Sequence, residues 1–266
     1  MKQPNTLGQH SWLRYFRIYS VASLVLYSIP AFAITGNAPP ASGFAARPIV
    51  MVVDSRGDLC TGTALARDLV LTAAHCVDGK LNYTVKTFQG GPPVSAQGIA
   101  IHPRFNPASY AAARATADIA LVKLAAPLTE LVMPAKLAPA RQVAVGEMLT
   151  IAGFGTTADG SARGLGIPRM ARLSVTGKPG SLQIRLFDLA TRDQRVGLGA
   201  CTGDSGAPVF AGAGASLIGQ VIGIVSWSTA PNDEEGCGGL TGVTPLILYR
   251  GWIMDTARKF NSPLAP

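Results

Sequence analysis

Short apolar runs of four to eleven residues, rich in β-branched side chains, recur along this chain between turn residues. Glycine and proline clusters such as Gly90-Gly91-Pro92-Pro93 separate the runs, a pattern typical of strands joined by tight loops. With 30 glycines and 19 prolines, the chain is predicted to be all-β. The predicted strands are Ile49–Val53, Leu69–Thr72, Tyr83–Phe88, Ile119–Leu124, Met148–Gly153, Ala171–Val175, Leu182–Leu186, Ala207–Phe210 and Leu217–Trp227.

Two stretches depart from this pattern. Ala125–Arg141 is rich in alanine and proline and has little periodicity, so we interpret it as a linker between two β-barrels. The tail Leu246–Phe260 carries apolar residues at helical spacing, which predicts a C-terminal helix. Those apolar residues are Leu248, Trp252, Ile253 and Ala257.

The N-terminus has the features of a secretory signal. A basic region ends at Arg17, the apolar run Ile18–Ile29 follows, and Ala31-Phe32-Ala33 forms a small-residue cleavage pattern. The apolar run is shorter than the roughly 20 residues that a membrane-spanning helix needs. We therefore expect residues 1–33 to be a cleaved signal peptide and the protein to be secreted, extracellular or periplasmic. An uncleaved anchor is the alternative, but no stable membrane anchor is expected.

Charge narrows the possible partners. Only 14% of the 266 residues are charged, which does not fit a disordered chain. The formal net charge is +8, falls to +5 without residues 1–33, and is not concentrated in any run of more than two basic residues. This pattern favours an ordinary basic surface over a nucleic-acid site. The sequence contains no phosphate loop, dinucleotide fingerprint or metal-ligand cluster, so we expect no cofactor and no metal.

Four cysteines are present, namely Cys60, Cys76, Cys201 and Cys237. An even number in an exported chain indicates disulfides, and four cysteines allow three pairings. A zinc site is not expected, because the chain has no Cys-x-x-Cys pair.

Three short motifs carry candidate chemistry. The hexapeptide Gly203–Pro208 is a glycine-rich turn that would hold Ser205 outward. Upstream lie Thr72–Cys76, which contains His75, and then Asp118. A serine hydroxyl is a weak nucleophile at neutral pH. It needs a histidine to take its proton and a buried carboxylate to hold that histidine in the useful tautomer. The order His, Asp, Ser is one of the known chain orders for this arrangement.

The histidine is found by elimination. Of the three histidines, His10 leaves with the signal peptide, and His102 precedes a proline at a predicted strand end, where we expect a structural role. His75 remains as the general base. Asp118 opens the apolar strand Ile119–Val122, beside which a carboxylate is costly to bury unless it is paired.

From about Ile34 to the C-terminus, the chain resembles the chymotrypsin/trypsin-like serine proteases. The three motifs carry the resemblance, and Gly153-Phe154-Gly155 and Ser226-Trp227 also stand where family motifs are found. The resemblance implies two antiparallel six-stranded β-barrels, residues 34–135 and 136–266, with the active site between them. It also implies a secreted serine endopeptidase that hydrolyses protein or peptide substrates through an acyl-enzyme.

Residue roles follow from the resemblance. It implies that His75, Asp118 and Ser205 are catalytic, and that the backbone N–H groups of Gly203 and Ser205 form the oxyanion hole. The implied disulfides are Cys60–Cys76 and Cys201–Cys237.

The resemblance also implies an activation pair. In this family a new α-amino group folds inward and pairs with the aspartate before the nucleophile, which is Asp204 here. Ile34 follows the predicted cleavage site and lies 26 residues before Cys60, a spacing that suits the family. Cleavage after Arg47 is the alternative, but Pro48 is a poor residue there and the remaining arm is too short. We therefore expect signal peptidase itself to create the activating terminus.

The substrate pocket implied by the resemblance consists of Gly199, Ala200, Ser226, Trp227, Ser228 and Gly242. Its floor at Gly199 and Ala200 carries no charge, which favours an apolar residue before the scissile bond. The acidic run Asp233–Glu235 is a competing feature, since it would attract lysine or arginine if it folded over the pocket.

Two other classes of function remain open. A catalytically silent binding homologue would need none of His75, Asp118 and Ser205. An esterase-type acyl hydrolase would use all three, but Ser226-Trp227 suggests a strand that holds a peptide backbone. We expect a monomer that does not bind nucleic acid.

Overall fold

The computed structural model describes residues 34–178, 180–212 and 219–265. The chain divides into two compact units, Met1–Pro30 and Ala31–Pro266, and all described residues belong to the second. The expected signal peptide, residues 1–33, lies outside the described residues. Among the residues that are described, no helix is long and apolar enough to cross a membrane.

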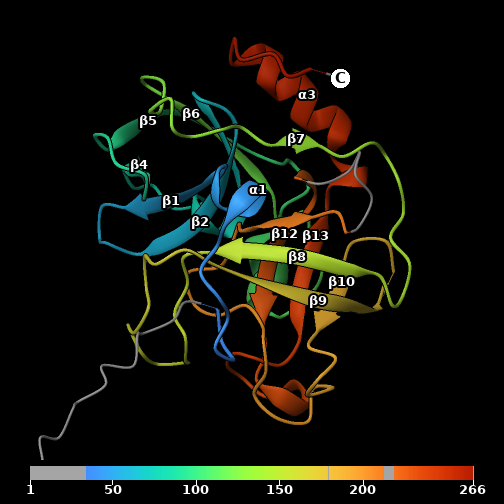
Figure 1. Cartoon of the computed structure of the whole chain (residues 1–266). Helices are drawn as coiled ribbons and strands as arrows, with labels where there is room; N and C mark the ends of the chain where they lie inside the picture. The colour runs from blue at the N-terminus through green and yellow to red at the C-terminus, as the bar shows by residue number, and fades with distance from the viewer. Residues whose placement is uncertain (1–33, 179, 213–218, 266) are drawn as a thin grey trace, which may run out of the picture. The chain divides into compact units, whose positions relative to one another are not determined.

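Six antiparallel strands close the first barrel in the order β1-β2-β3-β6-β5-β4. The pairing of β1 with β4 completes the ring, which lies in the upper left of Figure 1. The strands are β1 (Ile49–Asp54), β2 (Leu59–Ala66), β3 (Leu69–Thr72), β4 (Tyr83–Lys86), β5 (Val94–Ile101) and β6 (Ala120–Leu124).

The second barrel also has six strands, ordered β11-β8-β9-β10-β13-β12 and closed by pairing of β11 with β12. Strand β7 adds to β12 in parallel outside the ring. The strands are β7 (Lys136–Leu137), β8 (Met148–Gly153), β9 (Arg169–Gly177), β10 (Ile184–Phe187), β11 (Pro208–Phe210), β12 (Gln220–Ser228) and β13 (Thr241–Pro245).

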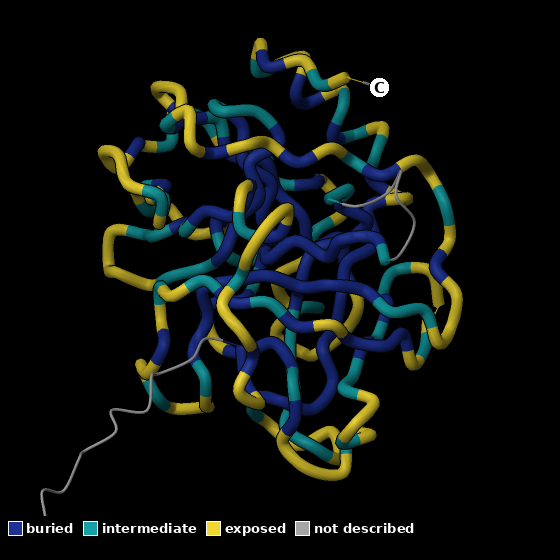
Figure 2. The backbone as a smooth tube through the Cα atoms, viewed as in Figure 1, coloured by how far each residue is buried: buried dark blue, intermediate teal, exposed yellow. Residues whose placement is uncertain are grey.

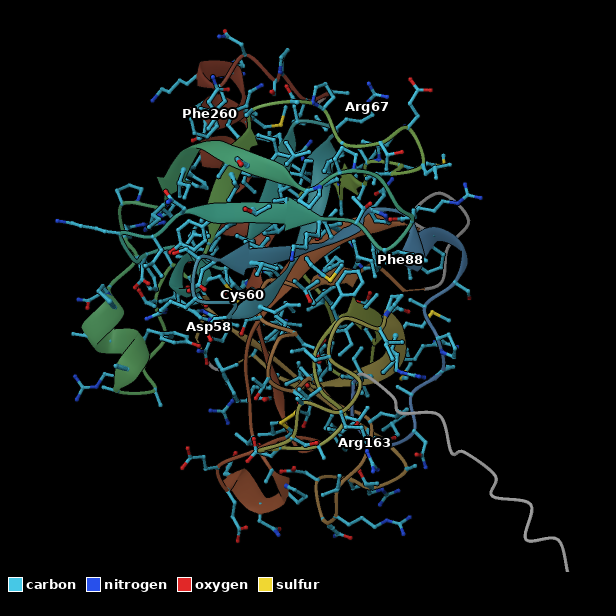
Figure 3. The ribbon with its side chains drawn as sticks, turned by 90° about the vertical axis from the view of Figure 1, so that its left-hand side faces the viewer. Asp58, Cys60, Arg67, Phe88, Arg163 and Phe260 are labelled. Atoms are coloured by element: carbon cyan, nitrogen blue, oxygen red, sulfur yellow. A yellow bond between two sulfur atoms is a disulfide. The ribbon has the colours of Figure 1, made fainter. Side chains whose placement is uncertain are left out.

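Helices are short and peripheral in this unit. The α-helices are α1 (Gly43–Ala46), α2 (Pro107–Ala111) and α3 (Arg250–Lys259), and the 3-10 helices are η1 (Ala74–Cys76), η2 (Pro231–Asp233) and η3 (Leu246–Leu248). Helix α3 is the expected C-terminal helix. The end of this helical segment packs on the first barrel, since Phe260, labelled in Figure 3, lies beside Gly98 of β5. The expected all-β fold of two six-stranded barrels with a C-terminal helix is confirmed.

The apolar core fills both barrels and continues between them, as the buried backbone in Figure 2 shows. One cluster joins Leu71 and Ala73 of the first half to Phe154 and Phe210 of the second. The contact between barrels is therefore part of the core, and residues projecting at the seam are held rigidly.

The sequence pattern misses strands β2, β5, β7 and β13. Strand β2 reads as polar because it contains Thr61 and Thr63, yet both are fully buried. Gly62 between them lies against Val70, so this strand packs closely where a larger residue would not fit. Periodicity detects burial of apolar residues and does not detect a buried threonine such as Thr61, whose hydroxyl is hydrogen-bonded inside the fold.

Candidate active site

Strand pairing brings His75 and Asp118 together. Thr72, at the end of β3, pairs with Ala120, at the start of β6, so the residues just beyond these ends meet. His75 lies on η1 after β3, and Asp118 precedes β6. Nδ1 of His75 lies 2.8 Å from Oδ2 of Asp118. The backbone N–H of His75 donates to Oδ1 of the same carboxylate at 3.0 Å. The carboxylate therefore fixes both the position and the ring orientation of His75.

Asp118 is almost fully buried, at 1% exposure, and is held by a third donor. The hydroxyl of Ser226 donates to its Oδ2 at 2.5 Å. The two oxygens of this buried carboxylate therefore accept hydrogen bonds from three donors. With Asp118 accepting, Nδ1 of His75 is assigned the proton, and Nε2 is left to accept one. Ser226 was expected only in the substrate pocket, and its bond to Asp118 was not predicted from the sequence.

Ser205 lies on the other side of the seam. Its carbonyl oxygen is 3.8 Å from the Sγ of Cys76, the neighbour of His75, so the nucleophile loop and the histidine turn are adjacent. No hydrogen bond joins His75 to Ser205 among the described residues, and Nε2 of His75 has Cys76 Sγ at 3.7 Å. Catalytic hydrogen bonds are often long without substrate and tighten when it binds.

The nucleophile loop depends on two glycines with positive φ, Gly203 at 93° and Gly206 at 80°. A side chain on Gly206 would overlap the Thr61 carbonyl and the Thr72 hydroxyl, so no other residue fits there. Within the described part of the chain, the N–H groups of Gly203 and Ser205 donate to no other protein group. Both residues line the same cavity, where these donors are available to an oxyanion.

Thr61 of β2 is hydrogen-bonded to the Gly203–Gly206 loop, a role that was not predicted from the sequence. Its N–H donates to the Ser205 carbonyl at 2.9 Å, and its hydroxyl donates to the Gly203 carbonyl at 2.8 Å. The same hydroxyl accepts the Phe154 N–H at 3.1 Å. One buried threonine of the first barrel thus links to two loops of the second. No sequence signal marks it, because its partners are more than 90 residues away.

Asp204 is fully buried beneath the nucleophile loop. It accepts the N–H groups of Gly155 at 2.8 Å and Cys201 at 3.0 Å. Burial raises the pKa of the Asp204 carboxyl to about 7, despite the opposing effect of these two N–H donors. Side chains on Gly153 or Gly155 would overlap this carboxylate. Among the described residues, no cationic group forms an ion pair with this carboxylate.

The segment at Ile34 reaches the same region. Ile34 is fully buried in one apolar cluster with Ala200 and Ala207, the latter close to Asp204 in the chain. Thr35 follows it, donating its N–H to the Gly199 carbonyl at 3.1 Å. In the full chain the nitrogen of Ile34 belongs to a peptide bond and becomes an ammonium only on cleavage after Ala33. The activation pair itself stays a prediction.

Each barrel contains one disulfide, Cys60–Cys76 in the first and Cys201–Cys237 in the second, which is the pairing that the resemblance implies. The first ties the histidine turn to β2, where Cys60 is labelled in Figure 3. Two clusters of potential metal ligands occur among the described residues, and each contains one of these disulfides. Their sulfurs are bonded to each other and are not available as thiolate ligands.

A cavity of about 400 Å³ opens beside Ser205 and is lined from both barrels. Four of the six expected pocket residues line it: Ala200, Ser226, Trp227 and Ser228. Gly199 and Gly242 do not line this cavity, and their part in substrate binding stays a prediction. The Gly199 carbonyl instead accepts the Thr35 N–H, and Gly242 lies against the ring of Trp227, where any side chain would overlap it.

Two exposed carboxylates also line this cavity, Asp159 and Glu235. Glu235 is the end of the acidic run in the sequence, whereas Asp159 comes from a different loop and was not foreseen. Asp159 lies 3.8 Å from the Sγ of Cys237, beside the second disulfide. The cavity thus combines a neutral interior with acidic groups exposed to solvent.

Tyr110 of α2 packs against His75, a contact that was not predicted from the sequence. Its ring stacks on that of His75, with centroids 4.3 Å apart and planes 13° from parallel. Its hydroxyl donates to the Ser226 backbone carbonyl at 3.2 Å. Burial, with the nearby charge of Asp118, raises the pKa of the Tyr110 phenol, so the group remains a neutral donor.

The fold and this arrangement define a two-barrel protein with a serine-protease-like site at its seam, and comparison with known families agrees. The family model described as Trypsin matches residues 35–253, so the chain belongs to the trypsin family.

The chain is 28% identical over 229 residues to snake venom serine protease rhinocerase 4 of Bitis rhinoceros, a match that covers 83% of this chain and 86% of that protein. It is 31% identical over 201 residues to a trypsin-like protease of Streptomyces glaucescens, covering 69% of each. The structure of human heparin binding protein superposes with a TM-score of 0.67 at 22% identity, covering 87% of this chain and 99% of that one, which shows the shared fold.

Proposed function

We propose that this protein is a secreted serine endopeptidase in which Ser205 is the nucleophile, His75 the general base and Asp118 the orienting carboxylate. The observation that carries the proposal is the triply hydrogen-bonded Asp118, which orients His75 at the seam where the Gly203–Gly206 loop presents Ser205. A binding protein needs no such arrangement of buried charge, which is costly to maintain.

The proposed reaction follows from these positions. Nε2 of His75 takes the proton as Ser205 Oγ attacks the scissile carbonyl, and Asp118 stabilises the imidazolium without itself becoming protonated. The oxyanion that forms accepts the N–H groups of Gly203 and Ser205. His75 then donates its proton to the leaving amine, leaving an acyl-enzyme. Water hydrolyses that ester with His75 again acting as base.

A diverse peptide library tests this function directly. Mature protein should release new N-termini at internal positions, and Ser205→Ala should release none. Hydrolysis of small esters without any peptide cleavage would instead favour the acyl hydrolase alternative, and loss of both activities would favour the silent binding homologue.

We also propose export of the protein. The two disulfides are typical of oxidising compartments. The snake venom relative is named for a venom, which is a secreted fluid. Periplasmic or culture-medium fractions of an expressing cell should contain the protein with both disulfides formed, and its recovery only in the reduced cytosolic fraction would contradict export.

The pocket is expected to prefer a medium-sized apolar residue before the scissile bond. Its interior at Ala200 is neutral, and Asp159 and Glu235 are exposed, where an ion pair contributes at most about 1 kcal/mol. The Asp159→Asn, Glu235→Gln double variant should therefore change the ratio of kcat/KM for leucine to arginine peptides by less than about 5-fold. A strong arginine preference that disappears in the double variant would contradict the apolar assignment.

Removing the Tyr110 hydroxyl is expected to speed the cleavage of extended peptides. A substrate backbone that pairs with β12 needs the Ser226 carbonyl, which Tyr110 now occupies. Tyr110→Phe keeps the ring on His75 but frees that carbonyl, so kcat/KM should rise by roughly 3- to 10-fold, the effect of one hydrogen bond.

Labelling of Tyr110→Phe by a small fluorophosphonate provides the control, because this probe makes no backbone pairing with β12. Its rate should match that of wild type. Equal acceleration of both reactions would show that Tyr110 acts on His75 instead.

A further inference from the structure

We propose that a second, basic cavity beside Trp227 binds an acidic side chain of the substrate, on the acyl side of the scissile bond. The inference rests on the proposed endopeptidase function and adds a specificity site to it. Its key residue is Arg185 of β10, supported by Lys178 and Arg192.

The sheet places Arg185 and Trp227 in one row. Arg185 pairs with Gly242 across β10 and β13, and Gly242 pairs with Trp227 across β13 and β12. Directly paired residues share a face of the sheet. Because Gly242 has no side chain, the Trp227 ring lies over it, and the Arg185 guanidinium reaches to 5.8 Å from the ring centroid.

This row links two cavities. Trp227 lines the cavity beside Ser205, whereas Arg185 lines a separate cavity of about 600 Å³. A peptide extended along Ser226–Ser228 crosses Trp227 and comes within reach of Arg185. With about 3.3 Å per residue in a strand, the third or fourth residue before the cut lies in this range.

The second cavity is predominantly cationic. Lys178, Arg185 and Arg192 line it, against a single carboxylate, Asp193. Within the described part of the chain, none of the three cations is in an ion pair. The Lys178 ammonium donates to the Val143 carbonyl at 2.8 Å, which leaves donors of its own for a ligand.

Arg185 carries the clearest sign of a missing partner. Its Nε is buried with no hydrogen-bond acceptor, and a buried donor left unpaired is unfavourable. A carboxylate presents two oxygens that match the guanidinium geometry, and it can accept hydrogen bonds from the terminal nitrogens of Arg185 or, if the side chain shifts, from Nε. Phe187 and the methylenes of the arginine supply apolar walls for the stem of the side chain. A glutamate or aspartate side chain therefore fits this cavity.

Matched peptides test the site. One cleaved library peptide is resynthesised with glutamate or glutamine, in turn, at each of the four positions before the cut. Glutamate at the third or fourth position should raise kcat/KM by about 5- to 10-fold over glutamine at low salt. Much of this preference should be lost in 0.5 M NaCl, where charges are screened within about 4 Å.

Arg185→Gln should bring the glutamate-to-glutamine ratio of kcat/KM to about 1, whatever its effect on the two absolute rates. Arg172→Gln is the matched control, because Arg172 is exposed on β9 of the same barrel and lines neither cavity. It should keep the full preference. If Arg185→Gln does not fold, Arg192→Gln, at an exposed position, should lower the preference by about half.

Binding to Ser205→Ala separates this proposal from the enzyme proposal. Fluorescent peptides with glutamate should bind this variant more tightly than glutamine peptides, and the added Arg185→Gln change should remove the difference. An unchanged glutamate preference in Arg185→Gln and Arg192→Gln would overturn the site. So would equal binding of both peptides, or loss of the preference on adding sulfate at constant ionic strength, which would indicate a site for free anions.

Discussion

His75→Ala should lower the rate at which an organofluorophosphonate labels Ser205 by a factor on the order of 10⁴ or more, because Ser205 then has no base to take its proton. The protein should remain folded, since the His75 side chain is 16% exposed and belongs to no apolar core cluster. Mass spectrometry of the labelled peptide gives both the rate and the site of labelling.

His102→Ala is the matched control, because it removes a histidine whose role is structural. His102 is buried at the end of β5, and its ring meets the edges of Tyr249 and Trp252 at 4.9 and 5.0 Å. This variant should have a lower melting temperature than the wild type but the same labelling rate per folded molecule. Labelling of His75→Ala at the wild-type rate would overturn the assignment of the base.

A chain that starts at Ile34 should be at least about 100-fold more active than one carrying a single extra residue before it. In the predicted activation pair, the free ammonium of Ile34 is the positive partner of the buried Asp204 carboxylate. Leaving one side of a buried pair uncompensated costs roughly 3–5 kcal/mol, enough to disorder the oxyanion loop above it.

The two forms should also differ in how stability depends on pH. In the extended form, burial holds the pKa of Asp204 at about 7, above its unfolded value near 4. The contribution of protonated Asp204 to folding stability is therefore complete below about pH 4 and is lost as pH rises toward 7. In the free form, pairing raises the pKa of the Ile34 ammonium above about 8, so its stabilisation persists to neutral pH and is lost only in alkali.

Melting temperatures of both forms between pH 4 and 9 measure this difference. Between pH 5 and 7, the melting temperature of the extended form should fall below that of the free form. Asp204→Asn should remove most of the activity of the free form and change the extended form little, because its carboxylate is already unpaired. N-terminal sequencing of the secreted protein checks whether the mature chain begins at Ile34. Full activity in the extended form would refute the activation pair.

Much of the site was predictable from local motifs, because chemistry limits the choices. Only His75 is left as a base once His10 and His102 are assigned, and the glycines around Ser205 mark a turn that other residues cannot form. The missed residues share a different property. Thr61, Tyr110 and Arg185 are ordinary in their local sequence and become informative only through partners in other strands.

The pocket shows the same limit. Ala200 and Ser226, which were expected in the pocket, line the cavity. Gly242 instead lies under the ring of Trp227, and Asp159 of another loop also lines the cavity. Spacing along the chain predicts which residues neighbour the nucleophile. It does not predict which side chains from other loops reach the same cavity, since that depends on loop conformation.

The sequence by itself therefore determined the all-β class and the trypsin-like resemblance, and it predicted His75, Asp118 and Ser205 as the catalytic set. These depend on residue type and local order, which the chain states directly. Only the tertiary structure decided how Asp118 is satisfied, what lies over His75 and where Arg185 meets Trp227. Those features arise where strands far apart in sequence are paired, because side-chain contacts across a sheet depend on strand register, which no local pattern encodes.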